Sequence, residues 1–160
     1  MYYCYFKSPV GTLLLTGNEL LENLYFPLGK TRVEPEKEWI HSKEKFMKVL
    51  FQLEAYFNGE LTRFDLELNV SGTDFQKKVW QELVKIPYGE TISYSELAKR
   101  IGNPNASRAV GMANGRNPIS IIVPCHRVIG KNGSLTGFGG GLEAKKNLLE
   151  LEKRNKKKAL

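Results

Sequence analysis

The sequence predicts two small domains: an α/β N-terminal domain over residues 1–70, and a mainly α C-terminal domain over residues 71–160 with a winged-helix-like helix-turn-helix. Short apolar runs broken by turn residues near the start indicate strands, and apolar spacings of three and four further on indicate helices. The chain has 160 residues, of which 41% are hydrophobic and 26% charged. This length can bury the core of one domain, or of two small domains packed together.

The first domain is predicted to combine a small antiparallel sheet with one helix. From residue 2 to about residue 26, apolar runs alternate with the turn residues Ser8-Pro9, Gly11 and Gly17-Asn18. From Lys43 the apolar residues recur at helical spacing, and Asn58-Gly59 supplies a left-handed stop. Residues 64–69 then alternate between apolar and polar, which predicts one more strand with a single buried face.

Two capping motifs predict the first helices of the second domain. Thr73 and Gln76 have the spacing of a capping box, and Ser93 and Glu96 repeat it. The first helix carries an inward stripe of Phe75, Val79, Leu83 and Val84. The second helix turns Leu97 and Ile101 inward and stops at Gly102.

A third helix is predicted from about residue 106 to residue 114, capped by Asn103 or Asn105 with Pro104 in its first turn. Two short helices joined by a tight turn are the outline of a helix-turn-helix. At about 100° per residue the helix has two faces. The inward face holds Ala106, Ala109, Val110 and Ala113, and the outward face holds Arg108, Gly111, Met112 and Gly115.

The outward face of this third helix is nearly bare of side chains. A glycine in a helix costs about 1 kcal/mol relative to alanine, so a close approach of a partner to the helix backbone should offset Gly111 and Gly115. A slim helix bearing Arg108 suits the minor groove of DNA, which is only ~6 Å wide. The alternative is that the glycines permit tight helix packing and that Arg108 is a solvated charge.

Cys125 is the candidate reactive residue. Residues 119–123 form a short apolar run that predicts a buried strand, and Pro124 ends it directly before the cysteine. A free thiol has a pKa of about 8.5, so a nucleophilic cysteine needs a base or a positive charge beside it. His126 and Arg127 are adjacent in sequence, although His126 could equally be a core histidine. The hypothesis requires the thiol to lie next to a cavity.

The last helix supplies a candidate third member of the site. Ala144, Leu148 and Leu151 form its buried stripe, and Glu152 is angled toward the same side. A buried carboxylate needs a partner, and His126 would complete a Cys-His-Glu relay. Pairing of Glu152 with Lys145 is the alternative.

Charge and composition restrict the kinds of partner, metal and cofactor that this protein is expected to bind. The formal net charge is +7 with a pI near 9.4, which suits a polyanion such as DNA. A four-ligand zinc site would use both cysteines and both histidines and leave none of them free for chemistry, so neither a metal nor a cofactor is expected. A disulfide between Cys4 and Cys125 is possible on count, but a cytoplasmic protein without a membrane segment is expected to keep both thiols free.

The second half of the chain resembles the O6-alkylguanine-DNA alkyltransferases, also called methylated-DNA-protein-cysteine methyltransferases. The resemblance spans roughly residues 75–152. The motifs that carry it are Val79-Trp80, Pro87-Tyr88-Gly89-Glu90, Ile92-Ser93-Tyr94, Ala98, Gly102-Asn103-Pro104, Arg108-Ala109-Val110-Gly111, Asn117-Pro118, Pro124-Cys125-His126-Arg127-Val128 and Gly140-Gly141-Leu142.

The resemblance implies irreversible, single-turnover transfer of an alkyl group from O6-alkylguanine, and from O4-alkylthymine, in duplex DNA to Cys125. The nucleotide is first flipped out of the duplex. The family's Glu-His-water-Cys network maps onto Glu152, His126 and Cys125, with Asn117 steadying the site. Tyr94 is implied to aid flipping and to protonate the guanine, while Arg108 fills the vacated stack. A monomeric protein is expected.

Further residues are implied to contact DNA or the guanine. Those for DNA are Ser107, Gly111, Met112, Gly115 and Arg127. Those for the guanine pocket are Val128, Phe138 and Gly139, with the loop 133–141. Some relatives have tyrosine and serine where this chain has Phe138 and Gly139, so a hydroxyl contact is not expected there. Some have proline in place of Ser120, which leaves the size of the accepted alkyl group open.

Two other functions fit parts of the pattern. A module that binds lesions or regulates transcription would use the same helices without the relay and would leave the alkyl group on the base. A cysteine hydrolase built on Cys125, His126 and Glu152 would turn over esters or amides and ignore DNA.

Overall fold

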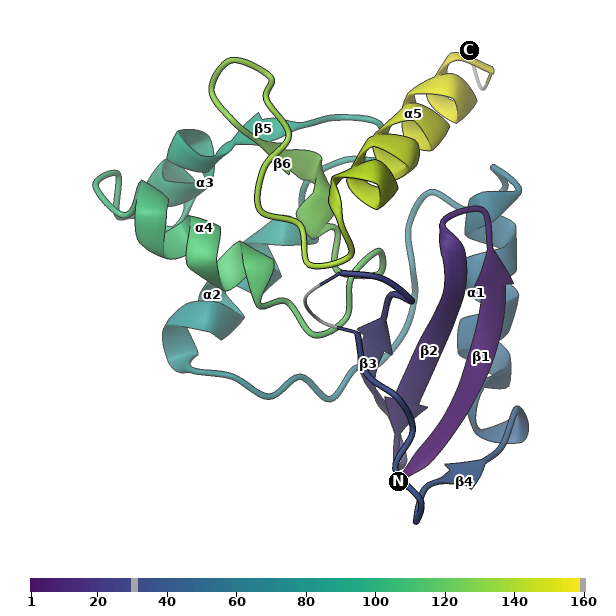
Figure 1. Cartoon of the computed structure of the whole chain (residues 1–160). Coiled ribbons are helices and arrows are strands. Elements are labelled where there is room, and N and C mark those ends of the chain that lie inside the picture. The colour runs from purple at the N-terminus through teal and green to yellow at the C-terminus, as the bar shows by residue number, and fades with distance from the viewer. Residues whose placement is uncertain (30–31, 159–160) are drawn as a thin grey trace.

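The N-terminal part of the protein is a four-stranded sheet covered by one helix. The computed structural model describes residues 1–29 and 32–158. The strands are β1 (Tyr2–Ser8), β2 (Gly11–Gly17), β3 (Leu21–Tyr25) and β4 (Ile40–His41), in the order β3-β2-β1-β4. The sheet is antiparallel except that β4 pairs with β1 in parallel. Helix α1 (Met47–Phe57), which follows the 3-10 turn η1 (Glu44–Phe46), lies against one face (Figure 1).

The β1–β2 hairpin forms where the turn residues predict it. Pro9 and Val10 connect the strands, the Ser8 hydroxyl donates to the Gly11 carbonyl (2.6 Å), and Gly11 has a φ of 108°. The second strand is buried without alternation from Leu13 onward. A strand buried in this way has both faces covered, here by α1 and by the C-terminal part of the chain.

The strand predicted over residues 64–69 is wrong. Leu68 forms an isolated parallel bridge with Leu21, and the Asn69 N–H donates to the Leu21 carbonyl (3.0 Å). The backbone of Asp65 is paired instead with the side chain of Gln52 on α1, which both donates to its carbonyl and accepts from its N–H (2.9 Å each). A buried amide side chain therefore takes the place of a neighbouring strand.

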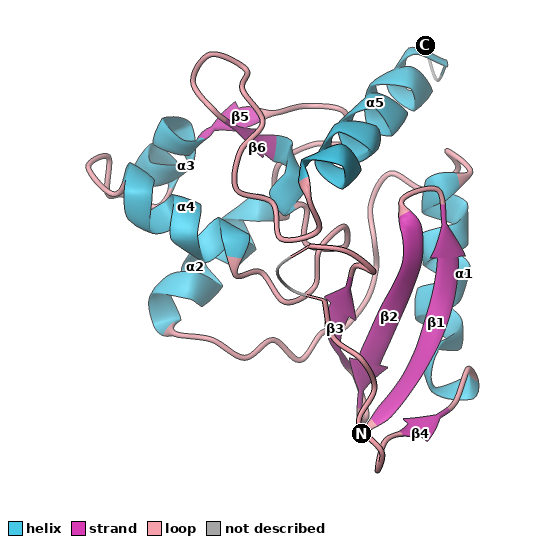
Figure 2. Ribbon diagram, in the orientation of Figure 1, coloured by secondary structure: helices cyan, strands magenta, loops and turns pink. Residues whose placement is uncertain are grey.

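The C-terminal part is mainly helical: α2 (Asp74–Leu83), α3 (Tyr94–Arg100), α4 (Ser107–Gly115) and α5 (Leu142–Lys158) (Figure 2). The capping box of Thr73 and Gln76 is present, and the Ser93 hydroxyl accepts from the Glu96 N–H. Gly102, with a φ of 84°, follows the C-cap residue of α3 and ends the helix as predicted. Val84, the C-cap residue of α2, is 52% exposed, so its assignment to the inward stripe is wrong.

Helix α4 departs from the prediction at its start. It begins at Ser107, and its N-cap residue Ala106 makes no side-chain capping bond, so the predicted asparagine cap is wrong. The Ala106 N–H donates instead to the backbone carbonyl of Asn103 (3.0 Å). Pro104 lies before the helix. Ala109, predicted to face inward, is exposed, whereas Asn114 is buried.

The two parts pack on one continuous core, and the predicted fold class is confirmed. The Leu24 N–H donates to the Pro118 carbonyl (2.9 Å), and the rings of Phe26 and Phe138 meet edge to face at 5.3 Å. A two-stranded parallel pair, β5 (Ile92–Ser93) and β6 (Val128–Ile129), joins α3 to the segment after Cys125.

The domain boundary at residue 70 stays a prediction. Within the described residues, no helix has the length and apolar character needed to cross a bilayer.

Candidate active site

Cys125 begins the 3-10 turn η2 (Cys125–Arg127), which follows a reversal of the chain and not the strand predicted over residues 119–123. The Val123 N–H donates to the Ile119 carbonyl (3.0 Å), and Ile121 has a φ of 77°, a strained value for a β-branched residue. The Asn117 side chain bonds to both ends of this chain reversal. Its Oδ1 accepts from the Ile119 N–H (3.0 Å), and its Nδ2 donates to the Val123 carbonyl (2.7 Å). The strand prediction is wrong because this side chain replaces a strand partner.

The Cys125 thiol is enclosed. Its residue is 3% exposed, and its Sγ lies 3.7 Å from the Ser120 hydroxyl. Burial raises the pKa of the thiol, while hydrogen bonds from Asn117 and Ser120 and the charge of Lys145 act to lower it. The surroundings therefore disfavour a thiolate through desolvation and favour it through three neighbouring side chains.

The structure brings His126 and Glu152 together. His126 Nε2 and Glu152 Oε2 are 2.6 Å apart, and both residues are buried. Burial lowers the pKa of His126, although Glu152 acts against this, so the imidazole is neutral at pH 7. With its proton on Nε2 toward Glu152, its Nδ1 is the basic nitrogen. Nδ1 has no hydrogen-bond partner among the described residues.

Glu152 accepts hydrogen bonds from several donors besides His126. They come from Tyr56 Oη (2.6 Å), Arg127 Nε (2.8 Å) and Nη2 (3.1 Å), and the Gly89 backbone N–H (3.1 Å). Burial alone would raise the pKa of this carboxyl, but the hydrogen bonds from His126 and Arg127 and the charge of Arg127 outweigh it and hold the pKa far below its usual range. Glu152 is therefore a permanent anion at neutral pH.

Arg127, expected to contact DNA, is a structural partner of Glu152. It is 6% exposed, and its Nη1 donates to the Ile86 carbonyl (2.7 Å). Its guanidinium also lies over the Tyr88 ring at 5.7 Å. These contacts neutralise the buried carboxylate and turn the side chain into the protein.

Lys145 does not pair with Glu152. It is fully buried, and its ammonium donates to the Val128 carbonyl (2.6 Å) and the Thr136 carbonyl (2.9 Å). Desolvation lowers its pKa to about 8. Its place in the site was not predicted from the sequence. The signal was its position on α5, because Lys145, Leu148 and Glu152 are spaced three and four residues apart on one face.

The loop between β6 and α5 is tied to the residues around the site. The Tyr94 hydroxyl donates to the Thr136 carbonyl (3.1 Å), next to the Lys145 bond. The Val128 side chain is fully buried, and Phe138 packs on Phe26 of the N-terminal part. Gly139 is half-buried. The residues implied for the guanine pocket thus lie along this loop and its base.

The residues expected to contact DNA, other than Arg127 and Tyr94, lie on α4. Arg108 and Met112 are exposed, the latter by 61%, and Ser107, Gly111 and Gly115 are half-buried. Among the described residues, Arg108 forms no ion pair. The buried Asn114, which was not predicted as a site residue, links this helix to the cysteine, since its Nδ2 donates to the Cys125 carbonyl (3.2 Å).

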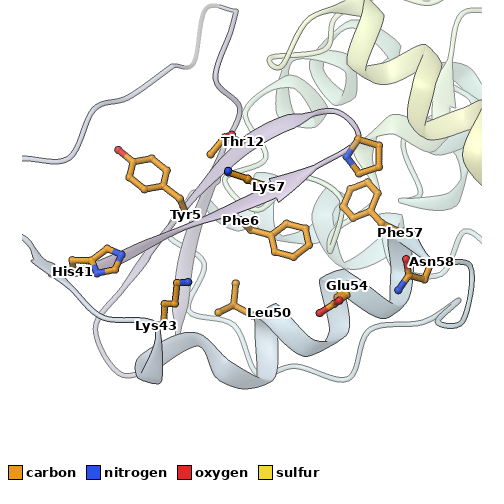
Figure 3. Close-up of a pocket in the computed structure, with 11 residues that line it drawn as sticks. Tyr5, Phe6, Lys7, Thr12, His41, Lys43, Leu50, Glu54, Phe57 and Asn58 are labelled. Atoms are coloured by element: carbon orange, nitrogen blue, oxygen red, sulfur yellow. The ribbon is translucent and has the colours of Figure 1, made fainter.

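Two grooves lie on the described surface and neither is lined by Cys125, so neither is the cavity beside the thiol that the sequence hypothesis requires. The first, of about 960 Å³, lies between β1 and α1, where Phe6 and Phe57 stack and Leu50 points toward the sheet (Figure 3). The second, of about 640 Å³, runs beside residues 62–68 and reaches Pro124 and Arg127. Within the described residues, no cluster of side chains could hold a metal ion, and Cys4 and Cys125 are free thiols.

Comparison with known proteins gives a consistent result. Residues 1–70 match the ribonuclease-like domain of 6-O-methylguanine DNA methyltransferase, and residues 74–154 match its DNA binding domain. The methylated-DNA–protein-cysteine methyltransferase of Methanosarcina acetivorans is 57% identical over 95% of this chain and 98% of that protein. The Mycobacterium tuberculosis OGT crystallised with DNA is 52% identical with a TM-score of 0.89, covering 97% of this chain and 94% of that one. A methyltransferase from Pyrococcus kodakaraensis, 29% identical with a TM-score of 0.63, matches over 94% and 98%.

Proposed function

This chain belongs to the 6-O-methylguanine DNA methyltransferase family, and we propose that Cys125 is the residue on which it accepts the alkyl group. Its function is DNA repair, by transfer of an alkyl group from the O6 of guanine to a cysteine of the protein itself. The observation that carries the assignment is the buried pair of Glu152 and His126, the residue that directly follows Cys125 in the chain. The Glu152 carboxylate holds the Nε2 proton of a buried neutral imidazole, which leaves Nδ1 free to serve as the base for the thiol.

The transfer is a direct displacement at the alkyl carbon. The Cys125 thiol gives its proton to His126 Nδ1 through a bridging water, and the sulfur forms a bond to the carbon as the carbon–O6 bond breaks. The electron pair of that bond stays on the guanine, which takes a proton from the Tyr94 hydroxyl. The products are guanine and an S-alkylcysteine. Because nothing in this step regenerates the thiol, each molecule acts once.

We infer that an extruded base approaches the thiol from the side of the loop 130–141, because Thr136 of this loop bonds to Lys145, whose charge acts on Cys125. Cys125 is 3% exposed, so an extruded base reaches its thiol only if neighbouring residues move away from it. Thr136 on this loop is bonded to Tyr94 and Lys145 at the site, and the loop carries Phe138 and Gly139. Entry of the base through this loop would place the guanine against Val128, Phe138 and Gly139.

DNA binding is assigned to α4. Arg108 and Met112 are exposed on this helix, and Gly111 and Gly115 add no side chains to the same face. A face with few side chains can approach a minor groove closely. Arg108 occupies the stack after the nucleotide is flipped, and Tyr94 supports the flipped state. Alkylated thymine, at its O4, is a second substrate of the same pocket. The protein acts as a cytoplasmic monomer, where its free thiols stay reduced.

Methyl-labelled O6-methylguanine duplex and mass spectrometry test the acceptor. We expect one methyl group per molecule, on the peptide containing Cys125, and none on a C125S variant that retains Cys4. Label on Cys4, or repeated turnover, would contradict the assignment. A protein that only bound lesions would leave the label on the base.

Arg108→Ala tests nucleotide flipping separately from chemistry. We expect the variant to lose far more transfer from a methylated duplex than from free O6-benzylguanine, because only the duplex requires extrusion of the base. Equal losses on both substrates would remove Arg108 from this role.

A further inference from the structure

Tyr56, which lies on α1 in the N-terminal part, reaches into the proposed relay. It is fully buried, and its ring packs against those of Phe57 (5.0 Å), Phe64 (5.4 Å) and Tyr88 (6.0 Å). Its hydroxyl donates to Glu152 Oε2 at 2.6 Å. Burial and the neighbouring carboxylate raise the pKa of Tyr56 well above its ordinary value, so the hydroxyl keeps its proton and acts as a donor.

The oxygen that Tyr56 contacts is the one that accepts from His126. Glu152 Oε2 is 2.6 Å from His126 Nε2 and 2.6 Å from Tyr56 Oη. The other oxygen, Oε1, is occupied by Arg127 Nε and the Gly89 N–H. Arg127 Nη2 also reaches Oε2, at a longer 3.1 Å. Tyr56 therefore holds Oε2 from the side of the N-terminal part, while Arg127 and Gly89 hold the rest of the carboxylate.

We propose that Tyr56 is a positioning residue for alkyl transfer, acting through Glu152 to fix the orientation of the His126 imidazole. The proposal rests on the function assigned above to Cys125. Without the hydroxyl, a carboxylate held mainly by Arg127 is free to turn toward the guanidinium, because a charged donor is the stronger partner. His126 then loses the acceptor that fixes its Nε2 proton, and its Nδ1 is no longer presented to the thiol.

This role predicts a particular pH dependence. Near neutral pH the thiol depends on His126 to take its proton, so a misoriented imidazole slows transfer. At higher pH hydroxide increasingly takes the thiol proton in place of His126, and the defect shrinks. A loss of packing alone would slow transfer at every pH.

The experiment compares Y56F with Y88F in the full chain. Tyr88 is the matched control, because its hydroxyl accepts from Asn155 Nδ2 (3.2 Å) in the same aromatic cluster and no described bond joins it to Glu152. Single-turnover transfer is measured from pH 6 to pH 9 at saturating methylated duplex, together with duplex affinity and thermal unfolding. At pH 7 we expect Y56F to be slower by about tenfold, the factor that one hydrogen bond corresponds to, and Y88F to be within about twofold of the wild type. Duplex affinity should be unchanged, and the Y56F defect should fall to within about threefold at pH 9.

A double-mutant cycle with E152Q shows whether Tyr56 acts through the carboxylate. We expect Y56F to cost much less in the E152Q background than in the wild type, because the partner through which it acts is already altered. Additive losses would overturn the proposal. So would a wild-type rate in Y56F, an equal loss in Y88F, or a defect that is constant with pH.

Two further outcomes are separable. If the wild-type protein itself places no methyl on Cys125, the assigned function fails and not the role of Tyr56. If Y56F does not fold, 3-fluorotyrosine placed at position 56 alone replaces it. Its hydroxyl is a stronger donor of the same size, so the transfer rate at pH 7 must differ from that of the same replacement at position 88, and equal rates would overturn the proposal.

Discussion

Glu152 shows how a single buried residue can organise a site. A carboxylate removed from water is costly unless it is paired and hydrogen-bonded. Here His126, Arg127, Tyr56 and Gly89 all donate to it. Because Arg127 supplies the compensating charge, His126 can stay neutral and act as a base.

Replacement of Glu152 tests this account through stability. E152Q leaves the Arg127 charge buried without its partner, so we expect a loss of about 3–5 kcal/mol in the free energy of unfolding at pH 7. The pKa of Glu152 is depressed in the folded state, so its stabilisation is complete above the unfolded value of about 4.3 and is lost as pH falls below it. In urea unfolding, stability should therefore fall less steeply below that pH in E152Q, by about 1.4 kcal/mol per pH unit. Parallel curves for the two proteins would refute the depressed pKa.

Lys145 provides a second test at this scale. Its ammonium lowers the pKa of Cys125, against the effect of burial. We expect K145M to raise the pKa of that thiol further and to slow alkylation of Cys125 at pH 7. The measurement is the pH dependence of iodoacetamide labelling at Cys125, read by mass spectrometry with Cys4 as the internal control. The deficit should diminish above pH 8, near the pKa of about 8 at which the wild-type lysine loses its own charge.

At the scale of the element, α4 combines an exposed face suited to DNA with a buried face that serves the site. Asn114 on its buried side is bonded to the Cys125 carbonyl. Trp80 of α2 fixes the same helix, because its Nε1 donates to the Ala113 carbonyl (2.8 Å). The helix is thus held rigidly relative to the cysteine, as a duplex bound on it would need to be.

The glycine in the middle of α4 gives a prediction in which stability and binding change in opposite directions. A methyl group added at Gly111 would meet Tyr94 Cδ1 at 3.6 Å, an ordinary contact. We therefore expect G111A to raise the free energy of unfolding by up to about 1 kcal/mol. If the helix backbone approaches DNA closely, the same variant should bind an undamaged duplex more weakly in an anisotropy titration. An unchanged affinity would mean that the glycine serves packing and not DNA.

At the scale of the whole molecule, the two parts of the chain share one site. Tyr56 lies 96 residues from Glu152 in sequence, yet its hydroxyl contacts that carboxylate. The Leu24–Pro118 backbone bond and the Phe26–Phe138 contact join the same two parts elsewhere. The N-terminal sheet and helix therefore support the chemistry of the C-terminal part.

This arrangement predicts that the protein unfolds as one unit. A core that runs through both parts should give a single thermal transition, with equal calorimetric and van't Hoff enthalpies. Differential scanning calorimetry measures both. Two resolved transitions would show that the contacts between the parts are too weak to couple them.

Local signals in the sequence determined much of this protein. Thr73, Ser93 and Gly102 mark helix ends correctly, because a cap depends on bonds to residues within one turn. The confirmed fold class follows from the same periodicities. The sequence also indicated the pairing of Glu152 with His126, since a carboxylate near an apolar helix stripe has to find a partner.

The tertiary structure decided what depends on distant partners. A buried apolar run at residues 119–123 is compatible with a strand or a turn, and the Asn117 side chain selects the turn. From the sequence, Arg127 is a cation available for DNA. In the structure its bond to Glu152, 25 residues away in sequence, turns the side chain into the protein. Nothing in the sequence around Tyr56 predicts its contact with Glu152. Periodicity and capping report only what a residue does within its own element, whereas the partner of a buried polar group is set by how the elements pack.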